Sequence, residues 1–297
     1  MEGGANQGVL RFDPAQRARP FVVPRGESQS VISVIVPAMN EAACLPQLVA
    51  EIAGALRPLT WSSRLAGFEI VLVDDGSTDA TPEVLHVLAD DFPELHPLRL
   101  TRNVGQSAAT VAGIRVARGD YIATLDADLQ NDPADLVVLW KALKDAEASG
   151  QTLCAALGWR IKRQDVWSKR VISLVANRVR NFVLGQEIRD TGCSVRVFPK
   201  EIAIRLPAFK GCHRFFGPLL LREGCSLVQV PVRHRPRTHG ISHYNVWNRS
   251  IRVLVDLVGV AWLMRREARY EIAHVDVRQL VSEKELPLIR RHALREA

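Results

Sequence analysis

The stretch EIVLVDDGSTDATPEVL, residues 69–85, decides the fold because it contains a strand, a glycine turn and a helix in direct succession. Its first half is apolar and β-branched, which predicts a buried strand. Asp79 or Thr81 is placed to cap the helix that follows. A capping turn explains Asp79, but it does not require the adjacent carboxylates Asp74 and Asp75 at the end of the strand. A carboxylate at that point can accept hydrogen bonds from a base or a ribose.

Strand-like and helix-like segments alternate on both sides of this stretch. We expect strands at 31–37, 69–75, 98–100, 120–128 and 152–158, with helices at 41–57, 79–90, 105–117 and 133–147. This alternation predicts an α/β protein with an open, mostly parallel sheet and helices on both faces. Farther along we expect a basic helix at 165–184, a strand near 194–198, a helix near 214–223, a strand near 227–233 and a last helix at 246–267.

Polar side chains follow three of the predicted strands where each strand ends. They are Asn40 and Glu41, Asp74 and Asp75, and Asp126 and Asp128. In open α/β sheets, ligands bind outside the carboxyl ends of the strands. The three pairs are therefore expected to converge on one crevice.

The segment TLDADLQNDP, residues 124–133, is the sharpest of these strand ends. Alternation along an extended chain would send Asp126, Asp128 and Gln130 to the same side. Two carboxylates and an amide oxygen suit a hard cation such as Mg²⁺ or Mn²⁺ and leave positions open for phosphate oxygens. The alternative is an ordinary acidic turn before a helix that starts at Pro133.

The composition indicates a folded protein with two halves of opposite charge. The chain has 297 residues and a formal net charge of +7. Residues 1–150 carry 12 Lys and Arg against 20 Asp and Glu, whereas residues 151–297 carry 27 against 12. An acidic half suits a divalent cation, and a basic half suits phosphates, nucleic acid or an anionic membrane surface. Ordinary solvated surface charge is the alternative explanation.

Targeting and spanning segments are not expected. The first residues lack the basic and apolar regions of a signal peptide, and no run of about 18 apolar residues occurs. The five cysteines are scattered and include no C-x-x-C pair. We therefore expect a cytosolic protein whose cysteines are reduced and mostly buried.

Six ordered motifs carry a resemblance to a known family. They are IVPAMNE, VDDGSTD, RNVGQSAATVAGIRVARGDYIATLDADLQNDP, GWRIKRQDVWSKRVISLVAN, DTGCSVRVF and RPRTHGISHY. From about Val31 to Arg266, the sequence resembles the glycosyltransferase family 2 proteins of the dolichol-phosphate mannosyltransferase and polyprenyl-phosphate glycosyltransferase type. The resemblance implies a GT-A fold, of the nucleotide-diphospho-sugar transferase type, with Mg²⁺ or Mn²⁺ under the donor diphosphate.

On the donor side, the resemblance implies that the first two motifs bind the nucleotide-sugar and that D-x-D-x-Q holds the metal. The nucleotide-sugar residues would be Pro37, Asn40, Glu41, Asp74, its neighbour Asp75, and Asp126, with Arg237 and Ser242 from a flexible loop that closes over the donor. The metal ligands would be Asp126, Asp128 and Gln130.

On the acceptor side, the resemblance implies that a phosphate is bound by the arginine after the fifth strand and by a basic, serine-containing cluster on the next helix. These residues are Arg160, Lys169, Arg170 and Ser173, with Arg163 and Asp190 as further candidates. A solvated helix face is the alternative for any single arginine here. Catalysis is expected to depend on Asp126, Asp128 and Arg160.

Together these features predict an inverting glycosyltransferase that moves a sugar from a UDP- or GDP-sugar to a polyprenyl phosphate. The acceptor oxygen is already ionised, so positioning and charge stabilisation would suffice. The rival hypothesis is a family 2 transferase that acts on a glycan hydroxyl or on another lipid; a hydroxyl would need a base, for which Asp190 is the obvious candidate. A nucleic-acid-binding protein does not explain the acidic cluster, and the intact D-A-D-L-Q argues against an inactive scaffold subunit.

The chain is expected to have four parts. These are a flexible arm at 1–28, a GT-A catalytic domain at 29–245, an amphipathic helix at 246–269 and a charged tail at 270–297. Charges interrupt the helix, so it cannot span a membrane; it would lie in the interface or pack against the sheet or a dimer partner. We expect a peripheral protein on the inner membrane face, held by the lipid surface or by a membrane-protein partner, and a homo-oligomer is left open.

Overall fold

The computed structural model describes residues 30–62, 64–161, 177–236 and 246–266. The chain divides into two compact units, Met1–Ala261 and Trp262–Ala297, and of the second unit only residues 262–266 are described. The predicted arm at 1–28 and the predicted tail at 270–297 lie outside the described residues. The four predicted parts therefore remain predictions.

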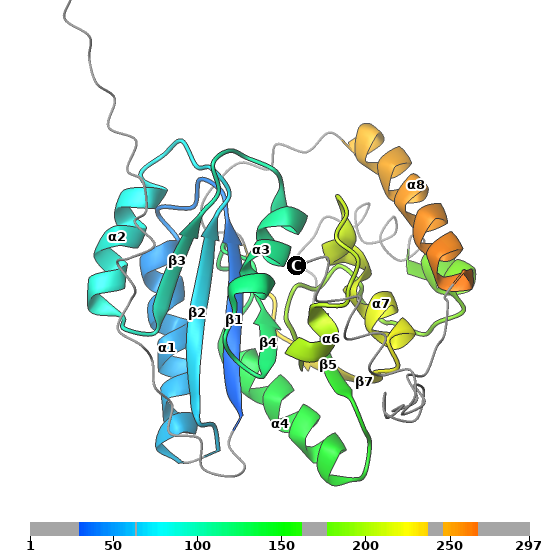
Figure 1. The fold of residues 1–297 in the computed structure, drawn as a ribbon, viewed down its shortest axis with the longest axis horizontal. Coiled ribbons are helices and arrows are strands. Elements are labelled where there is room, and N and C mark those ends of the chain that lie inside the picture. The colour runs from blue at the N-terminus through cyan, green and yellow to red at the C-terminus, as the bar shows by residue number, and fades with distance from the viewer. Residues whose placement is uncertain (1–29, 63, 162–176, 237–245, 267–297) are drawn as a thin grey trace, which may run out of the picture. The chain divides into compact units, whose positions relative to one another are not determined.

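A seven-stranded sheet with the order β3-β2-β1-β4-β6-β5-β7 forms the centre of the first unit (Figure 1). The strands are β1 Val31–Ala38, β2 Gly67–Asp74, β3 Leu95–Arg99, β4 Tyr121–Thr124, β5 Cys154–Arg160, β6 Arg196–Pro199 and β7 Ser226–Val232. Only β6 runs antiparallel to its neighbours, β4 and β5. The predicted open, mostly parallel sheet is confirmed.

Helices cover both faces of this sheet, as predicted. They are α1 Leu45–Trp61, α2 Thr81–Asp91, α3 Gln106–Val116, α4 Ala134–Ala148, α6 Lys200–Ala203, α7 Phe216–Arg222 and α8 Val246–Arg265, with a 3₁₀ turn η1 at Cys212–Phe215. Residues 177–184 are also helical. The first part of the basic helix expected at 165–184 lies outside the described residues.

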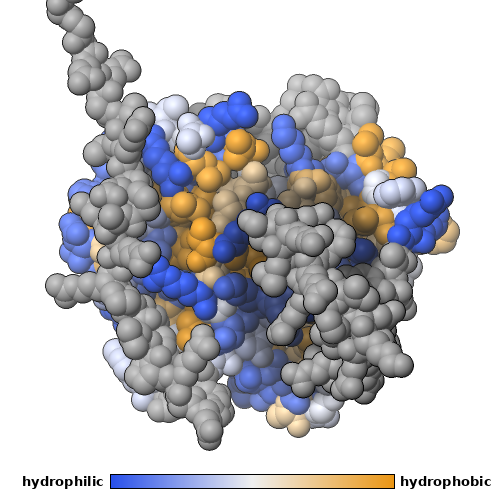
Figure 2. Space-filling view, viewed as in Figure 1, coloured by the Kyte–Doolittle hydropathy of each residue, from blue (hydrophilic) through white to orange (hydrophobic). Residues whose placement is uncertain are grey.

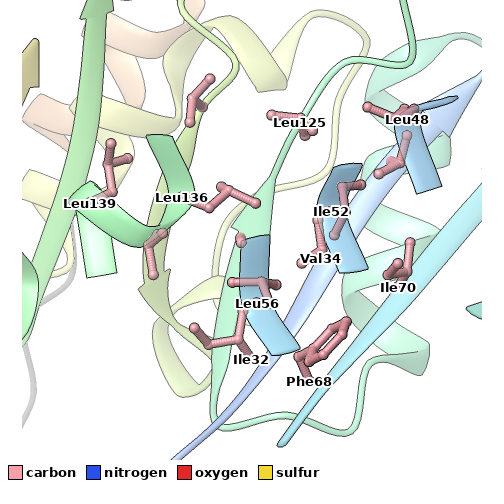
Figure 3. Packing of buried hydrophobic residues seen from close by; sticks show 14 of the residues in the cluster. Ile32, Val34, Leu48, Ile52, Leu56, Phe68, Ile70, Leu125, Leu136 and Leu139 are labelled. Atoms are coloured by element: carbon pink, nitrogen blue, oxygen red, sulfur yellow. The ribbon is translucent and has the colours of Figure 1, made fainter. Parts of the chain in front are cut away.

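The main core lies between the sheet and the helices α1, α2 and α4. Leu48, Ile52 and Leu56 of α1 face Ile32 and Val34 of β1 (Figure 3). Side chains alternate along a strand, so the intervening residues of β1 point to the opposite face, where α3 packs. The apolar side chains of α1 therefore cover one face of the sheet, and α3 covers the other face where it packs against β1 and β2.

The carboxyl ends of β1, β2 and β4 lie side by side. Ala38 at the end of β1 is in register with Asp74, and Thr124 at the end of β4 is beside Ile35. The strand expected at 120–128 is corrected here, because β4 ends at Thr124. The three polar strand ends thus meet at one edge of the sheet, as expected.

The chain beyond β4 forms a turn and not an extended strand. Leu129 has a φ angle of 60°, in the left-handed region. The Oδ1 atom of Asp128 accepts a hydrogen bond from the backbone N–H of Gln130 at 3.2 Å. Such local bonds from an aspartate compete with strand pairing. The alternation argument for Asp126, Asp128 and Gln130 therefore does not apply, although the segment still follows β4 directly.

All five cysteines are free and buried, as predicted. Burial raises the pKa of Cys193 to about 11 and that of Cys225 to about 11. A thiol with so high a pKa stays protonated at neutral pH and is a poor nucleophile. These cysteines act as packing groups.

We predict opposite effects for alanine at two helical glycines. A Cβ added at Gly113 of α3 would lie 2.6 Å from Cγ2 of Ile35, whereas one added at Gly54 of α1 would meet nothing within 4 Å. Gly113→Ala should lower the free energy of unfolding by about 1–3 kcal/mol through overpacking. Gly54→Ala, the matched control, should raise it by about 0.5–1 kcal/mol. Urea unfolding measures both; equal effects would contradict the close packing of α3.

Candidate functional site

The first two polar strand ends are bonded to each other. The backbone N–H of Asn40 donates to Oγ of Ser77 at 2.9 Å, and Oδ1 of Asn40 accepts the N–H of Thr78 at 2.8 Å. The N–H of Glu41 donates to Oγ1 of Thr81 at 3.1 Å. Asn40 has a φ angle of 56°, which asparagine tolerates better than most residues. These bonds join the loop that follows β1 to the loop that follows β2.

Asp74 and Asp75 are both buried and both engaged by protein groups. Oδ1 of Asp74 accepts the N–H of Ser77 at 2.8 Å, and its Oδ2 lies 3.2 Å from Nε of Arg99. The two oxygens of Asp75 accept the N–H groups of Val104 and Gly105, each at 2.8 Å. The structure therefore gives Asp75 a role in holding the loop before α3.

Pro37 lies near the end of β1, and Glu41 lies in the loop that follows this strand. Pro37 is half-buried near the end of β1, in register with Val73. Glu41 is half-buried, and its carbonyl accepts the N–H groups of Cys44 and Leu45 at the start of α1. The predicted contacts of these residues with a nucleotide remain predictions.

Asp126 and Asp128 are close enough to influence each other, and both keep part of their surface exposed. Loss of solvation and the like charge of Asp128 raise the pKa of Asp126. A hydrogen bond from Ser194 and the positive charges of Arg196 and Arg160 act in the opposite direction. Nε2 of Gln106 donates to Oδ1 of Asp126 at 2.7 Å. A cation between the carboxylates would relieve their repulsion, and it would compete with a proton for Asp126.

The oxygen atoms of this segment fit a hard cation. Within the described part of the chain, no group of three or more His, Cys, Asp or Glu side chains is arranged to hold a metal. A cation here would depend on the carboxylates of Asp126 and Asp128, with the remaining positions filled by an amide, water or phosphate oxygens. The side chain of Gln130 is half-exposed, and its backbone carbonyl accepts the N–H of Arg235 at 2.7 Å.

The structure joins two of the residues predicted for the acceptor phosphate. Arg160, at the end of β5, donates from Nε and Nη2 to the two oxygens of Asp190 at 2.7 and 3.0 Å. Oδ1 of Asp190 also accepts the N–H of Gly192 at 3.1 Å. Both side chains are largely buried. The other acceptor candidates, Arg163, Lys169, Arg170 and Ser173, lie outside the described residues, as do Arg237 and Ser242, which were predicted for the donor.

Arg196 of β6 is a charged residue near the site that the sequence analysis missed. Burial lowers its pKa, against the opposing influence of Cys193, Asp126 and Asp190. Its guanidinium lies 5.6 Å from the centre of the Phe216 ring, and its Nη2 donates to the carbonyl of Thr191. The signal was an arginine within the apolar strand SVRVF, because a buried charge requires a partner.

Residues 233–235, which follow β7, lie beside the acidic segment. Asn131 and His234 form an isolated antiparallel β-bridge. Arg233 and Arg235 each form a salt bridge with Asp132, at 3.0 and 3.1 Å. Arg235 also pairs with Glu51 of α1 at 2.7 Å. These contacts fix the chain at the point where it enters residues 237–245.

Most of the chain is similar to proteins of known family. Residues 33–206 match the profile of Glycosyl transferase family 2. The dodecaprenyl-phosphate galacturonate synthase of Rhizobium johnstonii is 34% identical over 80% of this chain and 68% of its own length. The undecaprenyl-phosphate 4-deoxy-4-formamido-L-arabinose transferase of Aeromonas hydrophila is 31% identical over 77% of this chain and 67% of its own length.

Two solved structures share the fold. A mannosyltransferase from Pyrobaculum calidifontis, in complex with GDP-Man and Mn²⁺, has a TM-score of 0.57 at 21% identity and covers 82% of this chain and 67% of its own. Glucosyl-3-phosphoglycerate synthase from Mycobacterium tuberculosis has a TM-score of 0.57 at 17% identity and covers 81% of this chain and 80% of its own. The predicted GT-A fold is thereby confirmed, and the profile match and the relatives together show that this chain belongs to glycosyltransferase family 2 and is a glycosyltransferase.

Proposed function

We propose that this protein transfers a sugar, with inversion, from a nucleotide diphosphate donor to a polyprenyl phosphate. One observation carries the proposal: the carboxylate of Asp126, beside the like charge of Asp128, also lies within the electrostatic influence of Arg160 and Arg196. A site that combines carboxylates with arginines can hold two phosphate groups near each other without neutralising a cation.

The names of the relatives support this choice of substrates. Both relatives compared above are named for a polyprenyl phosphate, and the mannosyltransferase structure contains GDP-Man and Mn²⁺. The synthase structure contains UDP and Mn²⁺. We therefore propose a nucleotide-sugar donor and a divalent cation, with Mn²⁺ as the first to test against Mg²⁺.

The reaction needs positioning more than proton transfer. Asp126 and Asp128 would hold the cation, which stabilises the charge of the departing nucleoside diphosphate. Arg160 would orient the acceptor phosphate, one oxygen of which attacks the anomeric carbon while the bond to the diphosphate breaks on the opposite side. That oxygen is already ionised, so no side-chain base is required.

The geometry around Asp190 favours a phosphate acceptor over a glycan hydroxyl. A hydroxyl acceptor would need a general base within hydrogen-bond reach. Both oxygens of Asp190, the obvious candidate, accept bonds from Arg160, and one also accepts the N–H of Gly192. A carboxylate engaged in this way suits the orientation of Arg160 better than proton abstraction.

We also propose that α8 attaches the protein peripherally to the cytoplasmic face of a membrane. Among the described residues, no helix is both long and apolar enough to cross a bilayer. Leu254, Val255 and Val258 are exposed on α8, as is Trp262, while Leu257 is buried. Figure 2 shows hydrophobic side chains at the surface along this helix. An apolar helix face with an exposed tryptophan and Arg265 near its end suits an anionic lipid interface.

The acceptor class is testable by transfer from labelled UDP- and GDP-sugars into undecaprenyl or dolichyl phosphate. With Mn²⁺ or Mg²⁺ present, we expect label in the organic phase from one donor, and EDTA should abolish it. Tight nucleotide binding without labelled lipid from any donor would overturn the polyprenyl phosphate acceptor and favour a glycan or another lipid.

Asp128→Ala should lower kcat/KM by about 100-fold or more, because the charge on the departing diphosphate would lose much of its stabilisation. Asp145→Ala, at an exposed position of α4, is the matched control and should leave the rate unchanged. Both variants would be assayed over a range of Mn²⁺ concentrations. Near-normal turnover of Asp128→Ala would contradict the cation site.

Val258→Glu should weaken flotation with vesicles that contain anionic lipid, because it places a charge on the exposed apolar face of α8. Val87→Glu is the control, since Val87 of α2 has a similar exposed fraction, 61% against 62% for Val258. Equal flotation of both variants would contradict attachment through α8. If the unaltered protein does not bind vesicles either, and Val258→Glu but not Val87→Glu changes the mass in solution, the face contacts a second copy of the chain, and not lipid.

A further inference from the structure

Gln106, the first residue of α3, contacts Asp126 of the acidic pair directly. Its Nε2 atom donates to Oδ1 of Asp126 at 2.7 Å. The side chain of Gln106 is exposed, so the bond forms at the surface. No other residue of α3 makes a hydrogen bond to Asp126 in the part of the chain that the structure describes.

The backbone before Gln106 is fixed by Asp75. The two oxygens of this buried carboxylate accept the N–H groups of Val104 and Gly105, each at 2.8 Å. Gly105 has a φ angle of 96°, a conformation that glycine adopts readily. The chain therefore enters α3 in one defined direction, and the side chain of Gln106 starts from a fixed point.

The residue after Gln106 is held by residues that lie far along the chain, in and just before η1. Oγ of Ser107 accepts the N–H of Gly211 at 2.8 Å and lies 2.6 Å from Nδ1 of His213. Ser107 is itself buried. The first turn of α3 is thus held by Asp75 at one end and by η1 and the residue before it at the other.

We propose that Gln106 is a positioning residue that holds the Asp126 carboxylate in the orientation that receives the cation. This inference rests on the cation of the proposed function. Hydrogen bonds from outside the ligand set orient a carboxylate and tune its affinity for a metal. The bond of Gln106 occupies one lone pair of Oδ1, and Ser194 is a second side-chain partner of the same carboxylate.

The chemistry of an amide suits this task. A lysine or arginine at the same place would also orient Asp126, but its charge would oppose that of the cation. Arg160 and Arg196 already act on Asp126 as positive charges. A neutral donor orients the carboxylate without reducing further the negative charge that attracts the metal.

Gln106→Leu should raise the Kd for Mn²⁺ by about 10- to 100-fold, the usual effect of removing a hydrogen bond to a metal ligand. Free Mn²⁺ would be measured by electron paramagnetic resonance, with Mn²⁺ alone and with Mn²⁺ plus UDP or GDP. Nucleotide binding in EDTA should be unchanged. Activity should be reduced at low Mn²⁺ and should approach that of the unaltered protein at saturating Mn²⁺.

Gln47→Leu is the matched control. Nε2 of Gln47 donates to Oε1 of Glu51 at 2.8 Å on the exposed surface of α1, so the same substitution removes the same kind of bond elsewhere. An unchanged Kd for Mn²⁺ in Gln106→Leu would overturn the proposal. A loss of nucleotide binding in EDTA equal to the loss of Mn²⁺ binding would also overturn it, because the effect would then lie in the loop. Weakened Mn²⁺ binding without lipid-linked product from any donor would support the role of Gln106 and refute only the proposed acceptor.

Discussion

A buried carboxylate needs hydrogen-bond donors, and the two N–H groups that donate to Asp75 hold the loop that leads to α3. Its oxygens bind the N–H groups of Val104 and Gly105, which belong to the loop between β3 and α3. Gly76 lets this loop approach, since a Cβ there would lie 2.6 Å from the backbone of Arg102 and Asn103. The end of β2 thereby sets the position at which α3 begins, and α3 in turn reaches the end of β4.

The two oppositely charged halves of the chain both contribute charged groups to the site. The acidic first half contributes Asp126 and Asp128, whereas the basic second half contributes Arg160 and Arg196. Buried ions are costly unless they are paired, and Asp190 meets part of that requirement through its two bonds to Arg160. Arg160 is thus paired with Asp190, and its positive charge also acts on Asp126 of the acidic segment.

Much of this arrangement could be predicted from local patterns. Apolar runs that end in polar pairs located the carboxyl ends of β1 and β2, because a parallel sheet places such ends at one edge. The same reasoning extended β4 too far. After Thr124 the chain forms a turn in which Leu129 is left-handed and Asp128 bonds to the backbone of Gln130. Strand alternation is valid only while a neighbouring strand keeps the chain extended.

The contacts of Gln106 and Ser107 could not be read from the sequence, because their partners are distant along the chain. Ser107 contacts Gly211 and His213, which are 104 and 106 residues away in the sequence. A glutamine at the start of a helix carries no pattern that names its partner, whereas Arg196 did carry one, as a charge within an apolar strand. Residues that bind a ligand directly tend to form recognisable motifs; those that orient them depend on the packing of separate elements, and the structure is needed to find them.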